Sequence, residues 1–222
     1  MRKFFAALIL AAFAVAMLGL FRPAGAADFE SEALQTVRAI TVPEGMTGAA
    51  SICSAVVIAP GYAMTARHCT KIGMHVDGLP ATYAIVAAGV DADIGLVHAP
   101  GLACPCAALG ARPAVGESLT IVGFPSGGER RSVGPAKVRL IGSLSDVLPD
   151  MTYPGVFIIS DTAVLMYGDS GGGAFANRES RWELIGINSV GLPARAPTHP
   201  WDTDIPEIGS GFVPVDLAPA GR

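Results

Sequence analysis

A serine enclosed by glycines is the first feature of this sequence that could carry chemistry. Residues 167–175 read YGDSGGGAF and place Ser170 directly after Asp169, with one glycine before the pair and three behind it. A serine hydroxyl becomes a nucleophile when a nearby base takes its proton, and the oxyanion that then develops needs N–H donors. Glycines let a substrate carbonyl approach the backbone amides of Gly168 and Ser170. Because the stretch is also typical of an ordinary β-turn, a catalytic interpretation needs a base elsewhere.

A base and an acid are both available upstream. Residues 53–69, CSAVVIAPGYAMTARHC, predict an apolar strand, a turn, and a second short strand that ends at His68. Residues 91–99, DADIGLVHA, place Asp93 at the mouth of another apolar strand, where its carboxylate could orient the imidazole. Asp91 is an alternative acid, since two residues of spacing put both side chains on one face if the strand begins that early.

Three short motifs, taken together, resemble those of the trypsin-like serine peptidases of the chymotrypsin fold. TARHC at 65–69 resembles the family's histidine motif, DIGLV at 93–97 its aspartate motif, and GDSGG at 168–172 its nucleophile motif, in the family's order. The resemblance covers about residues 51–215. VGFPSGG at 122–128 and SDTAV at 160–164 are similar to the compact bacterial members of the family.

The resemblance implies a role for each matched residue. Ser170 would be the nucleophile and His68 the general base and later the general acid, while Asp93 would hold the imidazole tautomer. The amides of Gly168 and Ser170 would form the oxyanion hole. Hydrolysis would then pass through an acyl-enzyme on Ser170.

The resemblance also places a specificity pocket. Val164 and Met166 would lie at its base, and Ser189, Val190 and Gly191 would form the wall that pairs with an extended substrate strand. Cleavage after Lys or Arg needs a carboxylate at the base, and residues 164–166 supply none. We therefore expect an uncharged pocket that prefers apolar or small side chains.

The sequence departs from the family at the residue before the nucleophile. Family members that are activated by cleavage pair this aspartate, here Asp169, with a freed N-terminus that begins with an Ile-Val-like sequence. No such sequence follows the predicted leader. Asp169 therefore needs another partner, unless the chain is cut elsewhere, for instance before Ala39 or Ile40.

Short runs rich in Val, Ile and Ala recur between Gly and Pro residues and predict strands. The candidates are 53–59, 81–88, 94–98, 118–122, 136–142, 156–164, 172–176, 182–190 and 211–215, and a short helix at 28–39 is the one helical alternative after the leader. This pattern predicts an all-β fold. The family resemblance implies two six-stranded antiparallel β-barrels, at about residues 40–110 and 116–216, packed together with the catalytic cleft between them.

The N-terminus has the composition of a secretory signal peptide. Arg2 and Lys3 precede an apolar run over residues 4–21 and a small-residue stretch, AGAA. We expect residues 1–26 to be removed, leaving a peptidase domain at 27–222 that is secreted or periplasmic and has no stable membrane insertion. An uncleaved anchor is the alternative, since about 18 apolar residues can just span a bilayer.

Charge and cysteine content limit the partners. The leader holds three of the 15 basic and none of the 19 acidic residues, so the remaining chain is acidic and nucleic-acid binding is not expected. The four cysteines suit an oxidising compartment. Sequence separation favours pairing Cys53 with Cys69 and Cys104 with Cys106, although free thiols or a metal contact remain alternatives for CPC. We predict no metal and no cofactor.

The sequence thus predicts a serine endopeptidase that acts on peptide or protein substrates. One alternative is a catalytically silent relative that binds peptides or a partner protein through the same cleft. Another is an esterase that uses the same nucleophile, although the strand-to-helix G-x-S-x-G context of the α/β-hydrolases is absent.

Overall fold

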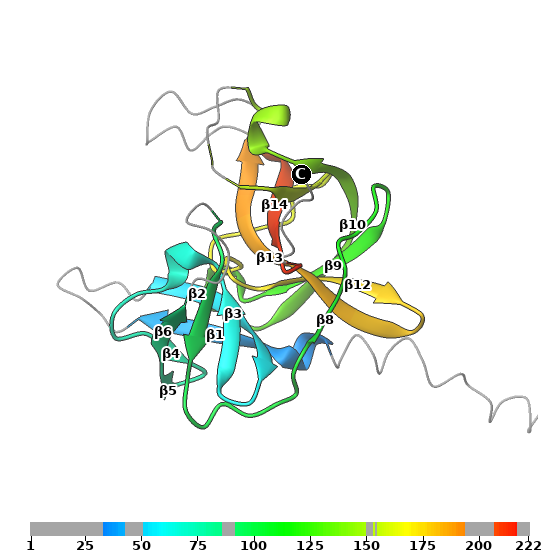
Figure 1. The fold of residues 1–222 in the computed structure, drawn as a ribbon. Helices are drawn as coiled ribbons and strands as arrows, with labels where there is room; N and C mark the ends of the chain where they lie inside the picture. The colour runs from blue at the N-terminus through cyan, green and yellow to red at the C-terminus, as the bar shows by residue number, and fades with distance from the viewer. Residues whose placement is uncertain are drawn as a thin grey trace, which may run out of the picture.

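The protein is built from two β-sheets that lie side by side (Figure 1). The computed structural model describes residues 33–42, 51–85, 92–149, 153, 155–193 and 207–216. A helical turn at 33–36 leads directly into the first strand at Val37, so the alternative helix at 28–39 is wrong for residues 37–39. Within these ranges no helix is both long and apolar enough to span a bilayer.

The first sheet has seven strands in the spatial order β5-β4-β1-β2-β3-β7-β6. Its central pair, β2 and β3, forms an antiparallel hairpin whose turn includes Gly61 at a φ of +79°. The strands are β1 (Val37–Val42), β2 (Ser51–Ala59), β3 (Tyr62–Thr65), β4 (His75–Val76), β5 (Leu79–Pro80), β6 (Thr82–Ile85) and β7 (Gly95–His98).

The second sheet closes on itself. Strand β12 pairs with both β9 and β13, so β12, β9, β10, β11, β14 and β13 form a ring, and β8 adds to β13 in parallel. The strands are β8 (Ala108–Leu109), β9 (Ser118–Gly123), β10 (Arg131–Gly142), β11 (Phe157–Ser160), β12 (Gly173–Arg178), β13 (Arg181–Pro193) and β14 (Glu207–Pro214). Three 3₁₀ turns complete the described elements: η1 (Arg67–Cys69), η2 (Pro125–Gly127) and η3 (Leu144–Asp146).

The predicted all-β class is confirmed, with differences in detail. The second half is a closed six-stranded barrel, whereas the first half is a curled sheet with β5 and β6 at its edges in the described residues. The predicted strand ending at His68 is wrong, because β3 ends at Thr65 and residues 67–69 form η1. Backbone hydrogen bonds stabilise this turn: Cys69 N–H donates to Ala66 O, and Thr70 N–H donates to Arg67 O.

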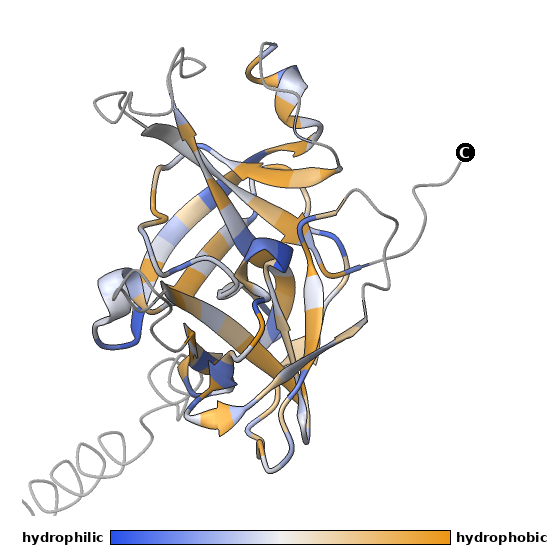
Figure 2. Ribbon diagram, turned by 90° about the vertical axis from the view of Figure 1, so that its left-hand side faces the viewer, coloured by the Kyte–Doolittle hydropathy of each residue, from blue (hydrophilic) through white to orange (hydrophobic). Residues whose placement is uncertain are grey.

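A continuous apolar core joins the two sheets. Val37 and Val57 of the first sheet belong to the same buried cluster as Phe157, Phe175 and Leu184 of the second. Figure 2 shows hydrophobic residues running along the strands of both sheets. Full burial of one such side chain stabilises the fold by roughly 1.5–3 kcal/mol, so the two sheets are fixed relative to each other. Loops at the junction are therefore anchored on both sheets.

Candidate active site

His68 and Asp93 form a hydrogen-bonded pair. The Nδ1 atom of His68 lies 2.8 Å from Oδ2 of Asp93, and the backbone N–H of His68 donates to Oδ1 at 3.0 Å. The Asp93 side chain is 6% exposed and the His68 side chain 44%. The carboxylate thus contacts both the ring and the backbone of one residue, which fixes the ring while leaving part of it open to solvent.

A serine hydroxyl also binds this carboxylate. Ser189 donates from Oγ to Oδ2 of Asp93 at 2.6 Å, and Ser189 is itself buried. Burial alone would raise the pKa of Asp93, but the hydrogen bonds from His68 and Ser189 and the charge of His68 outweigh it and hold the pKa below its ordinary value. Asp93 is therefore ionised at neutral pH and can stabilise a protonated imidazole. The alternative acid, Asp91, lies outside the described residues.

A disulfide fastens the histidine segment to strand β2. Cys53 of β2 is bonded to Cys69 of η1, directly after His68, with a Cα–Cα distance of 6.1 Å. Cys53, His68 and Cys69 are the one group of three metal-ligand side chains that cluster in the described part of the chain. Since both sulfurs are in the disulfide, neither is a thiolate, and the group is not a metal site.

The same strand holds the serine loop. The N–H of Ser54 donates to the carbonyl of Ser170 at 2.7 Å, and the Sγ atom of Cys69 contacts that carbonyl at 3.6 Å. On the other side, the N–H of Gly171 donates to Asn188 O on β13. Adjacent residues of β2, Cys53 and Ser54, therefore tether the histidine segment and the serine loop, and this places Ser170 beside η1.

Two glycines of the loop are required by its shape. Gly168 and Gly171 have φ values of +95° and +84°, which side-chain-bearing residues rarely adopt. A Cβ at Gly171 would collide with the carbonyl of Ser54 and the hydroxyl of Thr65. The loop can therefore pack this closely on β2 and β3 only without a side chain at this position.

Hydrogen bonds fix the two backbone carbonyls that precede the predicted oxyanion-hole amides. The carbonyl of Tyr167 accepts from Ser126 N–H, and that of Asp169 accepts from Gly172 N–H and from Nδ2 of Asn188 at 3.2 Å. In a trans peptide the N–H points opposite to the C=O, so these contacts direct the N–H groups of Gly168 and Ser170 away from them. Among the described residues neither amide donates to a protein acceptor.

Asp169 has a partner that the sequence did not reveal. Its Oδ2 accepts from Met166 N–H at 2.9 Å and lies 3.4 Å from Nη2 of Arg131 on β10. Burial raises the pKa of Asp169, and the Met166 N–H and the Arg131 charge offset this only in part. The guanidinium of Arg131 thus contacts Asp169, the residue that cleavage-activated family members pair with a freed N-terminus.

The residues predicted to line the specificity pocket lie on two segments, residues 164–166 and β13, which both contact β14. Val164 donates its N–H to the buried Oγ of Ser210 on β14, and Met166 is 51% exposed. Val190 and Gly191 are on β13, paired with residues 211 and 210. Ser189 directs its hydroxyl to Asp93, so this group is engaged with the carboxylate.

Four residues that organise the site had not been predicted: Ser54, Ser126, Arg131 and Asn188. Ser54 donates from Oγ to Gly168 O at 2.8 Å and accepts from Phe124 N–H at 3.0 Å, and Asn188 also donates to Val122 O. The sequence contains only weak signals for these four residues, because each of them contacts a part of the serine loop that is distant in sequence. The resemblance at VGFPSGG pointed to the segment that contains Ser126, but not to its contact with the serine loop.

Comparison with known proteins gives a consistent family assignment. The family model described as trypsin-like peptidase domain matches residues 53–187. No curated protein matches this chain.

Solved structures resemble this one at low sequence identity. Rv3671c of M. tuberculosis H37Rv, in an inactive mutant form, is 18% identical with a TM-score of 0.60, over 83% of this chain and 84% of that one. The HtrA-type protease AlgW with a tripeptide is 21% identical with a TM-score of 0.62, over 86% and 60%. A serine endoprotease from Yersinia pestis is 16% identical with a TM-score of 0.59, over 84% and 62%. These likenesses identify the fold as chymotrypsin-like.

Proposed function

Since this chain belongs to the trypsin-like peptidase domain family, we propose that it is a serine endopeptidase with His68, Asp93 and Ser170 as its catalytic triad. The observation that carries the proposal is the tethering of η1 and the serine loop to adjacent residues of β2, with Asp93 holding Nδ1 of His68. An endopeptidase needs this set of groups: a nucleophile, an oriented base, and free N–H donors beside them.

The chemistry assigned to each group follows from its contacts. Because Asp93 holds Nδ1 of His68, Nε2 is the ring atom that takes the proton from Ser170 as the hydroxyl attacks the scissile carbonyl. The N–H groups of Gly168 and Ser170 stabilise the oxyanion. His68 then protonates the leaving amine, and water hydrolyses the acyl-enzyme by the reverse proton path.

The proposed specificity excludes basic residues at the cleaved position. Residues 164–166 carry no carboxylate, and the nearest acid on that segment, Asp169, is already bound to Met166 and Arg131. Side chains of Val164 and Met166 would instead contact a small or apolar substrate residue. The tripeptide in the AlgW structure supports peptides as the ligand class.

We further propose that the protein acts in a secreted or periplasmic location. The support is the arrangement of all four cysteines as two disulfides, which persist in oxidising compartments. The signal-like residues 1–26 agree with this location, although they lie outside the described residues.

Covalent labelling tests the catalytic proposal. A fluorophosphonate should label the wild-type protein at Ser170 and should not label Ser170→Ala, while His68→Ala should label at least a hundredfold more slowly because the base is missing. Turnover of a peptide library then distinguishes the enzyme from a silent peptide-binding relative. Equal labelling of the wild type and Ser170→Ala, or labelling of neither, would refute the proposal. Preferred cleavage after Lys or Arg would refute the proposed specificity.

A further inference from the structure

The second disulfide lies on the connection between the two sheets and is exposed at one of its two cysteines. Cys104 and Cys106 are bonded to each other across a single residue, Pro105. The segment runs from β7 of the first sheet to β8, which pairs with β13 of the second. Cys104 is exposed and Cys106 half-buried, whereas Cys53 and Cys69 of the other disulfide are 9% and 2% exposed.

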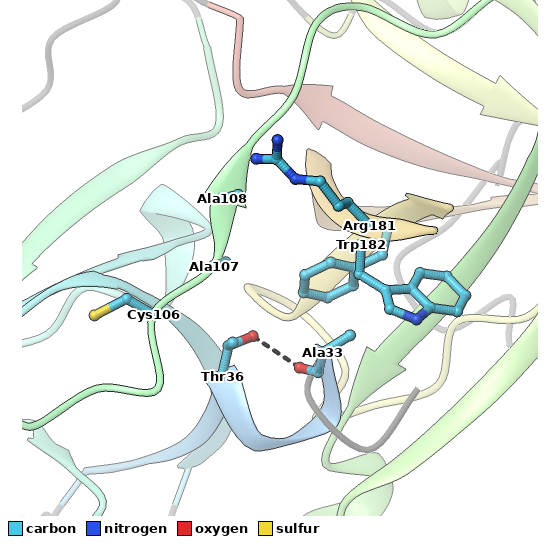
Figure 3. Close-up of a pocket in the computed structure, with 8 residues that line it drawn as sticks. Ala33, Thr36, Cys106, Ala107, Ala108, Arg181 and Trp182 are labelled. Carbon is cyan, nitrogen blue, oxygen red and sulfur yellow. Dashed lines mark hydrogen bonds between the residues drawn. The ribbon is translucent and has the colours of Figure 1, made fainter. Parts of the chain in front are cut away.

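Cys106 is the more buried cysteine of this disulfide and packs against the apolar core. Cys106 contributes to the wall of a pocket of about 180 Å³, together with Ala33, Thr36, Ala107 and Trp182. Figure 3 shows that its sulfur points out of this pocket, on the opposite side from Trp182. The exposed Cys104 is therefore the side from which a reductant can reach the disulfide.

The two disulfides differ in what they contribute to the fold. A disulfide stabilises mainly by restricting the unfolded chain, and the effect grows with the length of the loop that it closes. Cys53 and Cys69 are 16 residues apart and join two elements of the active site, whereas Cys104 and Cys106 are two residues apart. Opening the second bond therefore releases little chain entropy.

Hydrogen bonds hold the segment on both sides of the second disulfide. Leu102 accepts from Gly61 N–H through its carbonyl and donates its own N–H to Ala99 O. Ala107 donates its N–H to Val57 O on β2 at 2.7 Å. These contacts do not involve the sulfurs, so we expect them to remain after reduction and to keep the two thiols close enough to oxidise again.

We infer that Cys104–Cys106 is a reversible thiol–disulfide exchange site that reacts with dithiol reductants. A thiolate of the reductant attacks Sγ of the exposed Cys104, the S–S bond breaks, and Cys106 leaves as a thiolate that takes up a proton. The second thiol of the reductant then attacks the mixed disulfide and releases Cys104 as a thiol. Overall two electrons and two protons pass to the protein, and the reductant leaves as a disulfide.

A redox titration of the full chain tests this inference. The protein is equilibrated with graded ratios of reduced to oxidised dithiothreitol, quenched in acid and alkylated, and mass spectrometry scores each cysteine. We expect Cys104 and Cys106 to reach half-reduction at a ratio at least tenfold lower than Cys53 and Cys69. Joint reduction of both bonds, earlier reduction of Cys53–Cys69, or free thiols at Cys104 and Cys106 before any reductant is added would overturn the inference.

Two further measurements sharpen the test. The double variant Cys104→Ser, Cys106→Ser should lose the early transition and keep the late one unchanged. With glutathione as a single-thiol probe, the mixed disulfide trapped in acid should be on Cys104, and its location on Cys106 would overturn the proposed direction of attack. Because no readout uses catalysis, the result is independent of the proposed peptidase activity.

Discussion

Arg131 reaches from β10 to place Nη2 3.4 Å from the buried Oδ2 of Asp169, the residue directly before Ser170. The same nitrogen lies 3.5 Å from the carbonyl of Val164, at the base of the predicted pocket. One guanidinium thus connects the serine loop with the segment that would contact the substrate. We expect the loop to be ordered by this internal cation without a freed N-terminus.

Removing the Arg131 charge should weaken catalysis. Arg131→Met should lower kcat/KM about tenfold, since a lost charge-assisted hydrogen bond costs about 1.5–3 kcal/mol and this pair is partly exposed. Arg130→Met is the matched control, because Arg130 lies over the Phe124 ring, 5.6 Å from its centroid. Steady-state kinetics on a peptide ester measure both variants, and an equal loss in Arg130→Met would contradict the assignment.

The buried carboxyl of Asp169 predicts a pH-dependent stability. Burial raises its pKa above the ordinary 3.8, so the folded protein holds this proton more tightly than the unfolded chain does. The corresponding stabilisation is complete below pH 3.8 and is lost as the pH rises through the folded pKa. Asp169→Asn stays neutral throughout, so it should gain stability relative to the wild type as the pH rises through this window.

Urea denaturation at a series of pH values between 3 and 6 measures this trend. Asp161→Asn is the control with the opposite sign, because hydrogen bonds from Thr162 and the Lys137 backbone lower the pKa of that exposed carboxyl. Its stability relative to the wild type should fall, not rise, as the pH increases. The same trend in both variants would show that the Asp169 effect is not local.

Asn188 is expected to act on the proposed oxyanion hole through Asp169. Its Nδ2 holds Asp169 O, and so orients the peptide whose N–H belongs to Ser170. Asn188→Ala should therefore reduce kcat about tenfold with little change in KM, because the lost orientation matters mainly when the oxyanion forms. Hydrolysis kinetics separate the two constants. A change confined to KM would show that Asn188 contributes to substrate binding instead.

The sequence predicted the site's motifs better than the contacts that hold them. GDSGG, TARHC and DIGLV are contiguous, and the strands around them have clear apolar runs, so they were recognisable without coordinates. Arg131 is 38 residues from Asp169, and β10 was predicted to begin five residues later, at 136. Strands β4, β5 and β8 have two residues each, which is too short for a periodic pattern.

Replacing Ser54 can distinguish an effect on the geometry of the serine loop from an effect on the stability of the fold. Its Oγ holds the carbonyl of Gly168 and receives the N–H of Phe124, and the residue is fully buried. Ser54→Ala leaves both backbone groups without this partner, which should cost about 1–3 kcal/mol of unfolding free energy. It should also lower kcat, because the Gly168–Asp169 peptide connects the two amides of the proposed oxyanion hole.

Ser160→Ala is the matched control for this variant. Ser160 is a similarly buried serine whose Oγ lies 2.8 Å from Thr162 O and 3.5 Å from Ser210 O, and neither contact is to residues 167–172. Its removal should cost a comparable unfolding free energy while kcat stays within about twofold of the wild type. Urea titration and kcat, measured on both variants at the same temperature, make the comparison. If kcat falls equally in both, the loss in Ser54→Ala reflects general destabilisation, and Ser54 has no specific role in positioning Gly168.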